Sequence, residues 1–402
     1  MILHDYHHFA GADWERGTIR NALDYAGVIA PHTGQPLSDA MLLGVSGGSV
    51  FGYFPFAYEG QEPHAALLIN NTFTPFETLL KRLHLAHQDQ STGRAPRAVE
   101  HLQAALKAGK PAVVWTDIFT LPYNLLGTDA KMWSMMPILV YGYDETADQV
   151  WIADRARVPL TVTTDVLAQA RSRTAKEKHR LVTLGAPDLK KLKSAVEDGL
   201  RDTLTFMLEG APKGAKDNWG LAALGKWADL MVDEKSERGW SNLFPRGGAL
   251  YNGLLTAFHS LAVRGLDEGE DAGRGRFAEF LSEAAVVLEK PALEGASQAY
   301  RDAVPAWQRL TRALLPAEVP LLDEARSLTL SGHRLFRDQG MDSIPERETI
   351  KARLDAIHEQ MRADFPLDDA QASDLRAHIR AAVLDVQAAE HRAVETLKEA
   401  VG

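Results

Sequence analysis

Three carboxylates, Asp117, Asp154 and Glu15, are the candidate chemical groups of this chain. Asp117 lies near the end of the apolar stretch 111–119, and Asp154 ends the stretch 149–154. Carboxylates at the ends of buried strands can hold an amine and accept its proton. If the two aspartates face each other, like-charge repulsion raises the pKa of one and creates a usable acid. The alternative roles are structural: Asp117 caps the following turn, and Asp154 accepts a structural hydrogen bond.

Glu15 lies in the first turn of a predicted helix, residues 12–27, where Asp13 is the expected N-cap. A carboxylate there can act as a nucleophile or a general base. The helix dipole is expected to lower its pKa, which would weaken it as a base. Helix capping is the competing interpretation.

The chain of 402 residues contains no cysteine, so a disulfide, a thiolate metal site and a cysteine nucleophile are all excluded. The segment HDYHH (4–8) has residue types that bind zinc or iron, but its spacing matches no metal-site signature. The SGGS segment (46–49) lacks the spacings of phosphate-binding loops. We expect neither a metal nor a cofactor.

The elements that position these residues change in character near residue 187. The first 187 residues mix helix and strand patterns, and the short link between 137–145 and 149–154 predicts an antiparallel hairpin. We therefore predict an α+β domain over residues 1–187. Helices are predicted at 12–27, 37–44, 75–87, 96–108 and 162–173, and strands at 50–56, 65–69, 111–119, 137–145, 149–154 and 181–185.

Residues 188–402 favour helix in almost every window, which predicts an all-helical second domain. Two long amphipathic helices are expected within 345–401, separated near 365–369. Further breaks are expected near 210–216, 238–248, 265–275 and 316–320.

Composition narrows the classes of partner. The net charge is −10 and no basic run stands out, so nucleic acid is not expected as a partner. No apolar run reaches 18 residues, so no membrane association is expected, and a cytoplasmic protein is predicted.

Several stretches together resemble the butirosin biosynthesis protein H family, in the family's order. The second half is similar to the helical domain usually found behind the family's N-terminal domain. The stretches are GTIRNALDYAG (17–27), LSDAMLLGVSGGSVFGY (37–53), VVWTDIFTLPYN (113–124), ILVYGYDE (138–145) and VWIAD (150–154), followed by NWGLAALGKWADLM (218–231), RGWSNLF (238–244), FAEFLSEAAVVL (277–288) and AYRDAVPAWQRLTRALLP (299–316).

The resemblance implies a papain-like N-terminal domain and acyl transfer from a carrier-protein thioester to an amine. An acyl-carrier protein is accordingly an implied partner. In the family, the nucleophile is a cysteine in a His-Cys pair at the start of the first core helix. A histidine on a later strand and an acid one strand further on complete the triad.

This chain departs from that pattern at its two decisive positions. The His-Cys pair falls on Asp13 and Trp14, or on Glu15 with a slip of one residue. The catalytic histidine falls on Met136, or on Met135 or Pro137 with a slip. Only the third position is retained, as Asp154. An orienting acid without a base and a nucleophile cannot run a triad.

Five residues are predicted to line the cleft of the papain-like domain. Trp14 and Met136 either fill it or form an apolar or cation-binding pocket. Asp129 and Lys131 are candidate polar anchors beside it. The predicted cleft residues are Asp13, Trp14, Tyr53, Tyr123 and Met136.

Two functions are compatible with these residues. One is an amide-forming enzyme of natural-product biosynthesis in which Asp117, Asp154 or Glu15 holds the amine and accepts its proton while the cleft positions the acyl group. The other is a non-catalytic relative that binds a small molecule or a partner protein.

Overall fold

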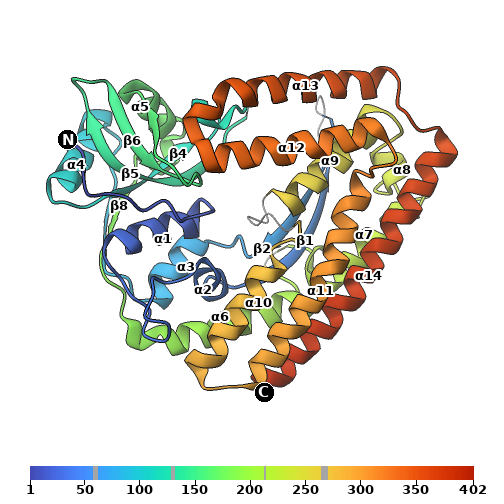
Figure 1. Ribbon diagram of the computed structural model, residues 1–402, viewed down its shortest axis with the longest axis horizontal. Coiled ribbons are helices and arrows are strands. Elements are labelled where there is room, and N and C mark those ends of the chain that lie inside the picture. The colour runs from blue at the N-terminus through green and yellow to red at the C-terminus, as the bar shows by residue number, and fades with distance from the viewer. Residues whose placement is uncertain (58–61, 128–131, 212–213, 264–269) are drawn as a thin grey trace. The chain divides into compact units, whose positions relative to one another are not determined.

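The computed structural model describes residues 1–57, 62–127, 132–211, 214–263 and 270–402 (Figure 1). It divides into two compact units, each built from separate segments of the chain. The sheet unit consists of Met1–Leu42, Thr74–Leu192 and Gly332–Glu348, and the helical unit of Leu43–Phe73, Lys193–Ser331 and Thr349–Gly402. The two units interleave along the chain. The predicted domain boundary between residues 187 and 188 stays a prediction.

The sheet unit contains a six-stranded antiparallel sheet in the order β3-β8-β4-β5-β6-β7. The predicted hairpin of β5 and β6 is confirmed, as is the mixed α+β class. The strands are β3 (His87–Gln90), β4 (Ala112–Asp117), β5 (Met135–Asp144), β6 (Gln149–Ala153), β7 (Leu160–Val162) and β8 (Leu181–Leu184).

Two edge strands were not predicted, because neither has an apolar pattern of useful length. All four residues of β3 (HQDQ) are exposed, and β7 has only three residues. The helices predicted at 75–87 and 162–173 are shorter than expected, because β3 and β7 occupy part of those ranges. The remaining helices of this unit are α1 (Glu15–Tyr25), α3 (Pro75–Arg82), α4 (Ala95–Lys107) and α5 (Thr164–Ser172), and α2 (Asp39–Val45) crosses from this unit into the other.

Helix α1 begins as its sequence predicts. The Asp13 carboxylate accepts hydrogen bonds from the backbone N–H groups of Arg16 (2.8 Å) and Gly17 (3.3 Å). These are donors that a helix start leaves unsatisfied, so Asp13 serves as the cap even though Trp14 follows it before the first helical residue. Gly27 follows the helix in the left-handed conformation (φ +67°).

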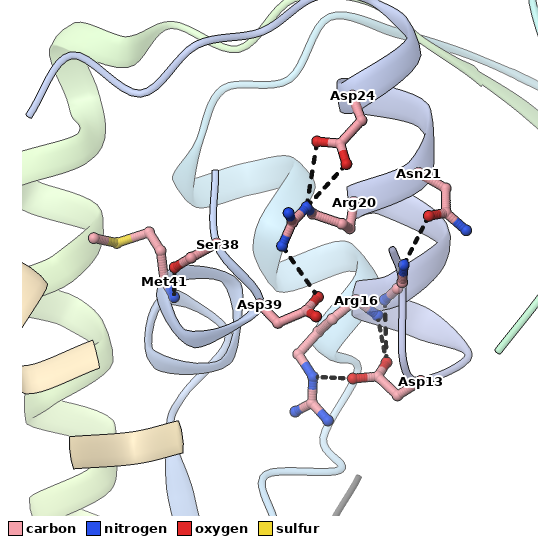
Figure 2. A network of polar contacts seen from close by, with 10 residues as sticks. Asp13, Arg16, Arg20, Asn21, Asp24, Ser38, Asp39 and Met41 are labelled. Carbon is pink, nitrogen blue, oxygen red and sulfur yellow. Dashed lines mark hydrogen bonds and ion pairs between the residues drawn. The ribbon is translucent and has the colours of Figure 1, made fainter. Parts of the chain in front are cut away.

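One ion pair links α1 to α2, and a second lies within α1, as Figure 2 shows. Arg20 Nε lies 3.0 Å from Asp24 on α1, and Arg20 Nη1 lies 3.7 Å from Asp39 on α2. Asn21 accepts a hydrogen bond from the N–H of Gly11 (2.8 Å). The polar residues of α1 therefore fix its orientation, while Ile19 and Leu23 are buried.

The helical unit packs helices around an antiparallel hairpin, β1 (Ser49–Phe56) and β2 (His64–Asn70). Both strands are confirmed, as are the predicted helix breaks near 238–248, 316–320 and 365–369 and, in its described residues, the break near 210–216, whereas residues 265–269 of the predicted break at 265–275 lie outside the described residues. The C-terminal region is largely helical, with α12 and α13 crossing between the units. Its helices are α6 (Leu192–Leu208), α7 (Gly220–Val232), α8 (Trp240–Leu243), α9 (Gly248–Ala262), α10 (Arg274–Leu288), α11 (Ala292–Leu314), α12 (Pro320–Gln339), α13 (Ile344–Ala363) and α14 (Asp369–Val401). Among the described residues, no helix is long and apolar enough to cross a membrane.

A fully buried ion pair joins the hairpin to the helices of this unit. Arg274 Nε on α10 lies 2.8 Å from Glu390 on α14, and both side chains are 0% exposed. The same guanidinium donates to the carbonyls of Val50 and Ile69 on the two hairpin strands. Trp307 Nε1 also donates to Glu390, at 2.6 Å. One arginine thereby satisfies acceptors from both strands and one carboxylate.

We predict that Arg274→Met lowers the free energy of unfolding by about 3–5 kcal/mol, because Glu390 is left charged and buried without its cation. Urea unfolding at pH 7 measures the loss. Arg309→Met is the matched control, because Arg309 and its partner Asp385 are exposed, and it should change stability by less than about 1 kcal/mol. The double variant Arg274→Met/Glu390→Met should recover most of the loss, and an equal or larger loss would contradict this account.

Candidate functional site

Asp117 and Asp154 lie toward the same end of the six-stranded sheet. Strand β5 lies between β4 and β6, and both of these strands run toward the start of β5. Asp117 on β4 is paired with Met135, and Ala153 on β6 is paired with Leu139. With ordinary strand spacings, this register separates the backbones of Asp117 and Asp154 by about 14 Å. Asp117 and Asp154 are therefore not paired across the sheet, and the like-charge coupling considered from the sequence stays a prediction.

Asp117 is buried and its carboxylate is occupied by local partners. It accepts hydrogen bonds from the N–H of Ser134 (2.9 Å) and the hydroxyl of Thr120 (2.9 Å). Arg173 Nε lies 3.5 Å away. These contacts brace the chain on either side of the β4–β5 connection and agree with the structural role considered for this residue.

Asp154, directly after β6, is buried and bound by two side chains. The hydroxyl of Tyr123 donates to Oδ2 (3.2 Å). Arg155 donates to both carboxylate oxygens, from Nε and from Nη2, at 3.2 Å each. Burial and the charge of Asp154 raise the pKa of Tyr123 well above its usual value, so its hydroxyl remains a donor.

Arg155 also contacts the residue at the position where the family resemblance puts the cysteine. Its guanidinium carbon lies 4.0 Å from the centroid of the Trp14 ring, a cation–π contact. Trp14 Nε1 is buried and has no hydrogen-bond acceptor among the described residues. We call Trp14, Tyr123, Asp154 and Arg155 the arginine clasp, because Arg155 joins the start of α1 to the end of β6.

The helix dipole is expected to lower the pKa of Glu15, but in the structure this pKa is raised. The side chain is half-buried, and the pKa is raised to about 7. Burial is the largest cause, and the negative charges of Asp13 and Glu77 add to it. Arg16 and the N–H of Phe76 act in the opposite direction but do not outweigh burial. Glu15 is therefore a better general base than its place in the sequence suggests.

The other predicted cleft residues fall in different places. Met136 is half-buried and paired with Thr116, beside Pro137, whose carbonyl accepts a hydrogen bond from Thr18 on α1 (3.3 Å). Tyr53 belongs to the helical unit, where it is buried and accepts a hydrogen bond from Trp240 Nε1 (2.8 Å). Asp129 and Lys131 lie outside the described residues. In the described ranges, no three His, Cys, Asp or Glu residues are grouped so that they could hold a metal ion.

Arg155 was not singled out from the sequence, and neither were three further residues of the site, His333, Phe336 and Arg347. These three come from the segment Gly332–Glu348, which belongs to the sheet unit. Phe336 lies 4.9 Å from the Arg155 guanidinium, and Arg347 donates to the carbonyl of Tyr123 (2.8 Å). This segment was predicted to be part of the helical domain, and no local pattern marks its return to the sheet.

A family comparison covers the first part of this site. The family described as butirosin biosynthesis protein H, N-terminal, matches residues 13–155. Residues 13–155 are therefore a butirosin biosynthesis protein H N-terminal domain. The matched range contains all four residues of the arginine clasp, and the domain lacks any cysteine. Among curated proteins, none matches the chain. The resemblance of residues 218–316 to the family's helical domain stays a prediction.

We predict that Glu15→Gln stabilises the protein above neutral pH. A carboxyl whose folded pKa is about 7 and whose usual value is 4.5 binds a proton more tightly when folded, so its contribution to stability falls as the pH rises from 4.5 to 7 and stays low above that. The variant should gain up to about 3 kcal/mol at pH 8 and almost nothing at pH 4.5. Urea unfolding at both pH values tests this, with exposed Glu100→Gln as the control. A gain that does not depend on pH would contradict the assignment.

We also predict that Arg155→Met lowers the free energy of unfolding by about 2–4 kcal/mol at pH 7, because Asp154 then keeps only the Tyr123 hydroxyl as its partner. Arg97→Met is the control, since Arg97 pairs with Glu100 on an exposed surface. Adding Asp154→Asn to Arg155→Met should recover part of the loss. Equal effects of Arg155→Met and Arg97→Met would show that the clasp does not stabilise the fold.

Proposed function

We propose that this protein is a non-catalytic relative of the butirosin biosynthesis protein H enzymes that binds a small molecule at the arginine clasp. The observation that carries the proposal is the set of contacts made by Arg155. It binds both oxygens of Asp154 and covers the ring of Trp14.

Triad chemistry needs an acid that orients a base and a base that faces a nucleophile. In this domain, the retained acid is bound to an arginine instead. A guanidinium keeps its proton throughout the physiological range, so Arg155 cannot serve as the base. The tryptophan beneath it offers no nucleophile. The residues at the family's catalytic positions therefore support a stable ion pair and not a proton relay.

A second candidate function is favoured by one observation, the raised pKa of Glu15. A half-buried carboxylate with a pKa of about 7 exchanges protons readily at neutral pH. In this alternative, Glu15 accepts the proton of an amine while the amine attacks an acyl thioester held beside it. Positioning supplies much of the rate enhancement without a covalent intermediate.

The two candidates are distinguished by a thiol-release assay. The protein is incubated with an acyl N-acetylcysteamine thioester and a panel of primary amines, and the released thiol is measured with a chromogenic disulfide. Because the chain has no cysteine, every thiol detected comes from the substrate. We expect the rate to equal that of the protein-free reaction for each amine.

The variant Glu15→Gln shows whether Glu15 causes any thiol release above the background rate. Thiol release above background that is lost in Glu15→Gln, but kept in the exposed control Glu100→Gln, would overturn the non-catalytic proposal in favour of the second candidate. Such a rate should also increase with pH through about 7, since the base must be deprotonated to act.

A further inference from the structure

Arginine side chains from two parts of the chain gather around the clasp in the sheet unit. Two aspartates lie among them: Asp154 pairs with Arg155, and Asp338 pairs with Arg157. The four arginines, which we call the arginine cluster, are Arg155, Arg157, Arg337 and Arg347. Counted as full charges, these six residues comprise four positive and two negative members.

Arg347 is the member with the clearest unused binding capacity. It is buried, and its Nε and Nη2 donate to the Ser343 hydroxyl (2.9 Å) and the Tyr123 carbonyl (2.8 Å). Both acceptors are neutral, and Arg347 has no carboxylate partner among the described residues. Its Nη1 has no acceptor there either. A buried guanidinium without an anion is costly, so a bound anion at this position would be stabilising.

Arg155 and Arg347 both contact the ring of Phe336. Their guanidinium carbons are 4.9 and 5.1 Å from the centroid of the same ring, Phe336. The charge of Arg155 also lowers the pKa of Arg347, after burial as the larger cause. The Nη1 of Arg155 likewise has no acceptor in the described part of the chain. Two guanidiniums therefore contact one aromatic ring, and Arg155 also donates from Nη2 to the side-chain oxygen of Asn124 (2.5 Å).

The immediate surroundings of these two arginines add a further donor. Trp14 Nε1, on the ring beneath Arg155, is buried with no acceptor among the described residues. His333 is held neutral at pH 7, because burial first, and then the charges of Arg337, Arg155 and Arg157, lower its pKa to about 4. The charge of Asp338 acts in the opposite direction and is outweighed. The local potential is positive.

We propose that the arginine cluster binds the oxyanion group, carboxylate or phosphate, of a small acidic ligand, with Arg347 and Arg155 as its principal contacts. This inference rests on the proposed binding function and names the chemical class of its ligand. Arginine suits the role because its fork of N–H donors matches the oxygens of both groups. Phe336 makes cation–π contacts with both guanidiniums.

The test uses inorganic phosphate and succinate as separate probes, titrated into the full-length protein in Tris chloride and followed by calorimetry. Sodium chloride at matched ionic strength is the reference for non-specific screening. We expect saturable binding of at least one probe at millimolar concentration or below. Tighter binding of phosphate indicates a phosphorylated ligand, and tighter binding of succinate indicates a carboxylic acid.

Variants connect the binding to the cluster. Arg347→Gln should weaken the affinity at least tenfold, and Arg347→Lys should weaken it less, because the charge is kept while the fork is lost. The control Arg97→Gln, on an exposed helix, should bind like the wild type. Urea unfolding without ligand shows whether each variant is folded. A folded Arg347→Gln variant with wild-type affinity, or no probe binding beyond the chloride reference, would overturn the inference.

A second readout comes from His333 and needs no variant. An anion bound among the arginines cancels part of their positive charge, so a saturating probe should move the pKa of His333 upward from about 4, as measured by side-chain NMR. An unchanged pKa at saturation would place the anion elsewhere. Absence of anion binding overturns this inference alone, whereas Glu15-dependent thiol release overturns the proposed function and leaves anion binding to be judged separately.

Discussion

The pairing of Asp154 with Arg155 is the interaction on which the site depends. A buried carboxylate must be matched by donors and by opposite charge, or it destabilises the fold. Tyr123 and Arg155 meet that need. Once Arg155 is held by Asp154, its guanidinium is positioned over Trp14, and Phe336 contacts it as well. The requirements of one buried charge thus assemble a cluster from four separate parts of the chain.

The helical unit uses the same physical device for a purely structural purpose. Arg274 and Glu390 are fully buried, and the guanidinium also binds carbonyls of both hairpin strands. The difference between the two units lies in the balance of charge. Arg274 has its carboxylate, a tryptophan and backbone acceptors, whereas the described contacts of Arg347 in the sheet unit are with neutral acceptors. The first arrangement is suited to stability and the second to recognition of an anion.

Replacement of the catalytic residues has changed the electrostatic character of the site and not only its reactivity. The resemblance implies a thiolate that would carry negative charge at the start of α1, where Trp14 now lies against a cation. The pKa of Glu15 is raised by the burial of its side chain and by neighbouring acids. The contacts of Asp154 explain why an acid retained at the third triad position still has a structural use.

The sequence by itself determined the α+β class of the first part, the β5–β6 hairpin, the capped helix α1 and the breaks of the helical region, because each rests on local periodicity or on a short-range hydrogen bond. The missing cysteine and the family of residues 13–155 were also evident from sequence. The edge strands β3 and β7 were not, since they lack an apolar pattern. Tertiary structure alone decided that Arg155 binds Asp154, that Glu15 is buried enough to titrate near 7, and that residues 332–348 return to the sheet unit. Charge pairing and desolvation depend on which distant side chains share a low-dielectric space, and no spacing along the chain encodes that directly.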